Sequence, residues 1–401
     1  MEGLPEELVV YTLDMLPKGM KPIAARTCKR WFYSCLPHDL RNRLSVTAVC
    51  GKLSLLRWAV KEQGCPLHRL TFRAAAQHGD LAVLKWLREQ GMALEEQLCD
   101  AAAEGGHLEA LQWLREEGCP WGTQTCANAA SNGHLEVLKW AHENGCAWNE
   151  ITCSEAAKGG HLEVLQWARE HGCPWGTNII ALAARYGHLG VLAWAKENGC
   201  DCSELVWWDA ARYGRLEVLK WAAANGYSLK SGVTTSAARG GHLETLKWLH
   251  ERGFPWTAAL CKAAARHGHL EVLKWARANG CPWDEEATRT AATINGQLEV
   301  LQWLRGNLSS SASWNEEAVC ITASRRGYVE VLKWAKENGS LPAMKVCIEA
   351  AKNGQLGVLQ WVHKEGRFSA EIARQVRGIA EEKRQEDILQ WLAGNELSQQ
   401  Q

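Results

Sequence analysis

Hydrophobic and polar positions follow one repeating pattern through most of the chain. Residues 121–147, WGTQTCANAASNGHLEVLKWAHENGCA, show one copy. In its second half Leu135, Leu138 and Ala141 recur three residues apart, which is the spacing of one apolar helix face. A shorter helix is predicted in the first half, and it stops near Gly133. Each copy therefore predicts a helix, a tight turn and a second helix that ends at Gly145, without strand signals.

The period of this pattern is set by tryptophans in the second helix. Seven successive steps, from Trp86 to Trp275, are all 27 residues long. A period in this range predicts a solenoid, in which each repeat packs only against its neighbours. The tryptophans are Trp58, Trp86, Trp113, Trp140, Trp167, Trp194, Trp221, Trp248, Trp275, Trp303, Trp334, Trp361 and Trp391.

The repeat, written AAxNGHLEVLKWAxENGC, resembles the ankyrin repeat over residues 41–393, in about thirteen units. The resemblance implies an all-α solenoid that binds proteins. Ankyrin units have about 33 residues, and the missing residues fall in the loop after Gly145. We therefore expect shortened or absent β-hairpin fingers. Glu386 replaces a core leucine in the last unit, which predicts a polar cap. Residues 394–401 are predicted to be a disordered tail.

The first forty residues follow a different pattern. The opening LPEEL at 4–8, a leucine at 16 and the closing CKRW at 28–31 are similar to an F-box, assigned to residues 1–40. That resemblance implies docking on a Skp-type adaptor, and through it on the cullin of an SCF-type ubiquitin ligase. Lys21 and Pro22 stand where the family usually has a leucine pair. Residues 1–40 could instead be an N-terminal cap on the first repeat. The matching residues are Leu4, Pro5, Leu8, Leu16, Cys28 and Trp31.

Composition narrows the class of partner. The 401 residues carry a formal net charge of zero, so no global field attracts nucleic acid or anionic membrane. No apolar run reaches the roughly 18 residues of a membrane span, and the first residues do not form a secretory signal. We expect a cytoplasmic protein, with the nucleus left open, and no nucleic-acid or membrane partner.

Cysteines and histidines recur at fixed repeat positions. Cys119, Cys146 and Cys173 share a position that Tyr227 and Phe254 fill elsewhere. A site that accepts such residues favours apolar burial, so we predict reduced thiols that act as small hydrophobes.

One histidine per repeat cannot converge on a metal ion, which needs four ligands. A hydrogen bond that bridges the turn is the predicted role of these histidines. A metal- or redox-active protein that uses these cysteines and histidines is a further hypothesis, beside the two binding functions given below. Since no catalytic motif is present, we expect no enzyme activity, no cofactor and no catalytic or metal-binding residue.

A column of cations follows the alanine pair in five consecutive repeats, edged by aromatic residues. Arginine and lysine at a helix C-terminus complement the helix dipole. The same column could also bind an acidic, extended segment of a partner, because arginine recognises carboxylates well. Earlier repeats break the column with Gln77, Glu104 and Ser131, which favours function. The candidate partner-binding residues are Lys158, Arg185, Tyr186, Trp208, Arg212, Tyr213, Arg239 and Arg266.

These patterns predict a protein–protein adaptor in two parts. Residues 1–40 would recruit the ubiquitin ligase, and the repeats would hold a protein substrate of unknown identity. The alternative is an ankyrin-like binding scaffold whose first forty residues are only a cap.

Overall fold

The computed structural model describes residues 53–61, 67–176, 178–199, 205–227, 232–307, 314–339 and 341–398. These residues are helical or form short connections, and no strand occurs among them. The expected all-α solenoid without hairpin fingers is therefore confirmed over the described ranges. The chain divides into two compact bodies, Met1–Cys202 and Ser203–Gln401. The candidate adaptor-docking residues Leu4, Pro5, Leu8, Leu16, Cys28 and Trp31 lie outside the described residues.

The N-terminal body alternates first and second helices of successive repeats. The first helices are α6 (Arg69–Gln77), α8 (Glu96–Glu104), α10 (Thr123–Ser131), α12 (Glu150–Gly159) and α14 (Ile179–Tyr186). The second helices are α5 (Leu53–Lys61), α7 (Leu81–Glu89), α9 (Leu108–Glu116), α11 (Leu135–Glu143), α13 (Leu162–Glu170) and α15 (Leu189–Glu197).

The C-terminal body continues the same alternation. Its first helices are α16 (Leu205–Arg212), α18 (Val233–Gly240), α20 (Ala258–His267), α22 (Glu285–Ile294), α24 (Glu316–Arg326), α26 (Ala343–Lys352) and α28 (Ala370–Glu382). Its second helices are α17 (Leu216–Ala224), α19 (Leu243–Glu251), α21 (Leu270–Ala278), α23 (Leu298–Asn307), α25 (Val329–Asn338), α27 (Leu356–Lys364) and α29 (Glu386–Ser398).

Local chemistry sets where these helices begin and end. The Asn149 side chain accepts a hydrogen bond from the Ile151 backbone N–H at 3.0 Å and so caps α12. Asp284 caps α22 in the same way through Ala287. At the other end of a repeat, Gly145 follows α11 with φ 81°, a left-handed conformation that only glycine adopts without strain. The predicted glycine position at the helix C-terminus is thus confirmed.

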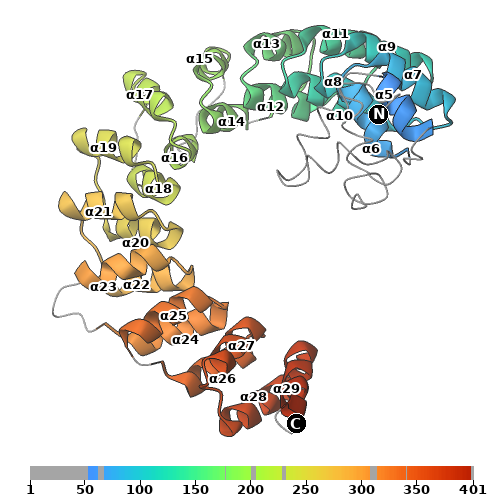
Figure 1. Ribbon diagram of the computed structural model, residues 1–401. Helices are drawn as coiled ribbons and strands as arrows, with labels where there is room; N and C mark the ends of the chain where they lie inside the picture. The colour runs from blue at the N-terminus through green and yellow to red at the C-terminus, as the bar shows by residue number, and fades with distance from the viewer. Residues whose placement is uncertain are drawn as a thin grey trace, which may run out of the picture. The chain divides into compact units, whose positions relative to one another are not determined.

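In each body the even-numbered helices form one layer and the odd-numbered helices form the other (Figure 1). Successive even-numbered helices pack closely, because most repeats have a small, fully buried alanine pair where these helices meet. Ala129 and Ala130 in α10 are both 0% exposed. Leu138 and Ala141, on the apolar face of α11, are also 0% exposed and fill the space between the two layers.

The predicted tail differs from the structure. A disordered segment was expected from residue 394, but α29 continues through Ser398. Glu396 stands where Gly145 follows α11, so no left-handed glycine ends this helix. Ile388 and Leu392 on the same helix are buried, so the capping repeat is anchored on one face.

Candidate partner-binding face

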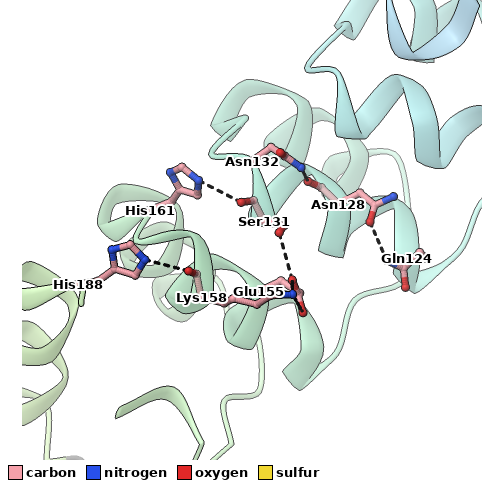
Figure 2. A network of polar contacts seen from close by, with 8 residues as sticks. All are labelled: Gln124, Asn128, Ser131, Asn132, Glu155, Lys158, His161 and His188. Atoms are coloured by element: carbon pink, nitrogen blue, oxygen red, sulfur yellow. Dashed lines mark hydrogen bonds and ion pairs between the residues drawn. The ribbon is translucent and has the colours of Figure 1, made fainter. Parts of the chain in front are cut away.

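A hydrogen bond between neighbouring repeats recurs at the turn between the two helices. His161 Nε2 donates to the carbonyl oxygen of Ser131 at 3.1 Å, and His188 Nε2 donates to that of Lys158 at 2.9 Å (Figure 2). The carbonyl belongs to the repeat before the histidine, 30 residues earlier in the chain. A hydrogen bond that bridges the turn was predicted for these histidines. The structure shows that this hydrogen bond joins the turns of two neighbouring repeats.

Glycine makes room for this ring. A Cβ atom at Gly133 would lie 2.5 Å from His161 Nδ1, and the glycine has φ 76°. Gln297 replaces the histidine in a later repeat, and its amide still donates to the Arg266 carbonyl at 3.4 Å. The contact therefore needs a donor of this length, not an imidazole. Among the described residues, no group of three or more His, Cys, Asp and Glu side chains could hold a metal ion.

The first cation of the predicted column is neutralised within its own helix. Lys158 Nζ lies 2.9 Å from Glu155 Oε2, and this ion pair raises the pKa of the lysine (Figure 2). Ser131 Oγ also donates to Glu155, at 3.1 Å, and ties α10 to α12. Lys158 is therefore part of an internal polar network, which weakens its candidacy as a partner-binding residue.

Two later repeats, in α24 and α26, also have a cation at this position, and one carboxylate neutralises both. Arg325 Nε lies 2.6 Å from Glu349 Oε2, and Lys352 Nζ lies 3.0 Å from Glu349 Oε1. Hydrogen bonds from Arg325 and then from Lys352 lower the pKa of Glu349, so this carboxylate stays ionised. Two cations thus share one anion on the surface formed by α24 and α26.

The middle of the column differs. Arg212, Arg239 and Arg266 are all exposed, and no ion pair reaches their guanidinium groups in the part of the chain that the structure describes. Two of the most exposed large apolar side chains accompany them: Trp208 is 37% and Tyr213 41% exposed. All five predicted residues lie in the C-terminal body, on or beside α16, α18 and α20.

Two further candidates lie in the N-terminal body. Arg185 is half-buried near the end of α14, and Tyr186 beside it is 40% exposed. The Tyr186 ring stacks against His188, with centroids 6.5 Å apart. Arg185 and Tyr186 thus belong to a different compact body from Arg212, Arg239 and Arg266.

The layer of odd-numbered helices carries a feature that the sequence analysis missed. In six of the described repeats the tryptophan of the second helix packs edge-to-face against the tryptophan of the preceding loop, as in Trp140 and Trp121, whose centroids are 5.6 Å apart. Arg115 covers the same Trp121 ring at 4.3 Å, and Arg277 covers Trp283 at 4.1 Å. The signal was an arginine six residues before the loop tryptophan. These rings contact each other and the arginines, so the aromatic and charged side chains of this layer already have partners within the protein.

The acidic residues of the second helices behave as helix support. Glu136 and Lys139 pair at 2.7 Å, and Glu244 and Lys247 pair at 2.6 Å, each three residues apart. Exposed pairs of this kind contribute little to stability. They balance charge on the odd-numbered layer, in contrast to the three arginines on the even-numbered layer.

The cysteines lie in the core as free thiols. Ten are buried and none forms a disulfide within the described ranges. Cys119 Sγ donates to the Glu95 carbonyl at 3.2 Å, and the neighbouring Cys119 thiol and burial raise the pKa of Cys99. Burial raises the pKa of Cys320 to about 11. Such thiols stay protonated at neutral pH, as expected of small apolar core residues.

Comparisons with known proteins support the repeat family in part of the chain. Residues 98–142 and 235–277 match the family model described as "Ankyrin repeats (many copies)". The two segments cover α8 to α11 and α18 to α21, so the ankyrin-like prediction is confirmed there. No curated protein matches the chain. No helix in the described ranges is long and apolar enough to cross a membrane.

The similar solved structures are helical repeat proteins. The pentatricopeptide repeat protein PPR10 from maize is 14% identical, with 98% of this chain and 73% of that chain covered and a TM-score of 0.32. The same protein in complex with an 18-nt psaJ RNA element is 14% identical, with 98% and 72% covered and a TM-score of 0.27. At these TM-scores the likeness carries no argument about partners. The ankyrin repeats support a protein-interaction scaffold.

Proposed function

We propose that this protein is the substrate receptor of a cullin-RING ubiquitin ligase of the SCF type. The observation that carries the proposal is the order of two sequence features in one chain. An F-box-like segment at residues 1–40 precedes repeats that bind proteins in the ankyrin family. The chain then does no chemistry itself. It brings a bound protein close to the enzyme that transfers ubiquitin.

The two parts have separate tasks in this proposal. The motif residues listed above, Leu4 to Trp31, dock the Skp-type adaptor and hence the cullin. The repeats hold the substrate through the layer of even-numbered helices. On that layer Arg212, Arg239 and Arg266 are exposed and form no ion pair within the described residues, and exposed aromatic rings lie beside Arg212. The odd-numbered layer is a weaker candidate, since its tryptophans and charges already pair with each other.

The test is capture of a purified Skp-type adaptor by the full chain. Leu8→Ala and Trp31→Ala should each abolish capture. The control Asp14→Ala, which changes a polar position between the motif residues Leu8 and Leu16, should preserve it. Melting temperatures of all three variants should match that of the parent, because a segment that docks an adaptor contributes little to the stacking of the repeats.

The second candidate function is a binding scaffold in which residues 1–40 cap the first repeat. It is favoured by the departures from the F-box pattern at Lys21 and Pro22. In that case the parent chain does not capture the adaptor, and Leu8→Ala or Trp31→Ala lowers the melting temperature. This result would refute the ligase proposal and leave a scaffold for protein partners.

A further inference from the structure

Three consecutive first helices of the C-terminal body each carry, in the last turn, an exposed arginine that forms no ion pair within the described residues. Arg212 ends α16, Arg239 lies in the last turn of α18, and Arg266 lies in the last turn of α20. The sequences of α18 and α20 contain no aspartate or glutamate, and α16 contains one, Asp209. Lys262, one turn before Arg266, adds a further exposed positive charge. The surface therefore has an excess of cations over three layers.

This excess is local rather than a general rule for helix ends. Further along the same body, Glu349 neutralises Arg325 and Lys352, and Glu317 pairs with Lys345. The position three residues before the cation holds Asp209 in α16 and Glu349 in α26, but Ser236 in α18 and Ala263 in α20. The carboxylate that occupies this position in other repeats is therefore replaced beside Arg239 and Arg266.

The three arginines also act on a common group. Partial burial lowers the pKa of His267, and the positive charges of His269, Arg239, Arg266 and Arg212 lower it further. A charge at His267 is therefore disfavoured by guanidinium groups from three different helices. These groups share one local field, which an incoming anion would experience as a single site.

Apolar surface borders the cations on one side. The Trp208 indole lies beside the Gly232 backbone, where a Cβ atom would be 3.5 Å from the ring. Trp208 is one helical turn before Arg212, and Tyr213 directly follows it, so the exposed rings flank the first cation of the row. An exposed aromatic ring beside arginine suits a peptide better than a small anion, because it can cover apolar side chains or proline.

The spacing of the row suggests the conformation of the ligand. Packed helices lie about 8–10 Å apart, so successive arginines start at about that separation. A polyproline II chain repeats its side-chain direction every third residue, with a rise of about 9.3 Å for three residues at about 3.1 Å each. Carboxylates three residues apart on such a chain would meet successive layers.

We propose that Arg212, Arg239 and Arg266, with Trp208 and Tyr213, bind an acidic, extended peptide segment that carries a carboxylate at every third residue. This inference deepens the proposed function, and rests on it, by naming the class of substrate segment that the even-numbered layer accepts. A peptide fits better than nucleic acid because the charge excess is confined to three layers. The chain as a whole has zero net charge, and the ankyrin repeats support protein partners.

The experiment measures fluorescence anisotropy with the full chain and a labelled peptide of Glu-Ala-Pro triplets. A peptide of the same composition with its glutamates clustered at one end tests the spacing, and a single-stranded RNA of equal charge tests the other class of ligand. The test variant is Arg239→Gln with Arg266→Gln. The matched control is Lys247→Gln with Lys274→Gln, which removes the same charge from the same repeats on the odd-numbered layer.

We expect the arginine double variant to bind the triplet peptide about tenfold more weakly, because two exposed charge pairs are lost. The lysine control should bind like the parent, and added salt should weaken binding. Both double variants should melt within a few degrees of the parent.

Equal loss in both double variants would overturn the assignment of the face. Equal binding of the clustered peptide would overturn the layer-by-layer spacing, and tighter binding of the RNA would overturn the peptide as ligand. Adaptor capture measured on the same protein separates the two proposals. Capture without peptide binding refutes only this inference, and peptide binding without capture refutes only the ligase proposal.

Discussion

The histidine that links neighbouring repeats allows a sharp test of how the stack is stabilised. His161→Ala removes the Nε2–H that donates to the Ser131 carbonyl at 3.1 Å, and it removes the ring that lies over Gly133. His161→Gln is the matched control. At the equivalent position Gln297 donates to the Arg266 carbonyl at 3.4 Å, so a glutamine side chain reaches the same acceptor.

The magnitude follows from what each variant loses. A hydrogen bond of this type contributes about 0.5–1.5 kcal/mol net. The ring is half-buried, and the loss of its packing adds a contribution of the same order. We expect His161→Ala to lower the free energy of unfolding by about 1–2 kcal/mol. His161→Gln should cost less than about 0.5 kcal/mol because the donor is kept.

The assay is urea unfolding of the full chain, followed by far-UV circular dichroism and tryptophan fluorescence. Stability in a solenoid depends on interfaces between neighbours, so the variant should shift the midpoint of the transition that includes α10 to α13. Its denaturant dependence should not change. If alanine and glutamine destabilise the protein equally, the hydrogen bond to the preceding repeat is not the source of the stability. If neither variant changes the midpoint, the contact itself contributes nothing measurable.

Three further outcomes follow from the same geometry. Gly133→Ala should destabilise the protein by more than the roughly 1–2 kcal/mol of strain that an alanine has in the left-handed conformation. Gly145→Ala should cost only that strain, since nothing lies within 4 Å of its Cβ position, and thermal unfolding of the two variants tests the difference. Leu138→Ala, at a fully buried position, should cost about 2–5 kcal/mol in urea unfolding. Burial lowers the pKa of His161 and His242 below 6.5 in the folded state, so the unfolded chain takes up their protons first as the pH falls. Stability should therefore be full above about pH 6.5 and decline below it, and melting temperatures that stay constant from pH 7.5 to pH 5 would contradict this assignment.

Much of this fold could be predicted from the sequence because its signals are local. The three-residue spacing of Leu135, Leu138 and Ala141 is a property of one helix, and Gly145 terminates that helix through its own backbone. Helix bounds, buried alanines and the absence of hairpin fingers in the described repeats followed from this pattern. The extent of α29 was missed: Glu396 stands where Gly145 ends the second helix of its repeat, so α29 continues through Ser398.

One ion pair of the candidate face could also have been predicted from the sequence. Glu155 precedes Lys158 by three residues, so their ion pair could have been predicted from helical spacing alone. The tertiary structure decided the rest. The partner of Arg325 is Glu349, 24 residues away, and the acceptor of His161 lies 30 residues earlier. Contacts of this kind depend on how one repeat is stacked and rotated on the next. The sequence of a single repeat contains the helices, but only their packing determines which charges meet and which stay exposed.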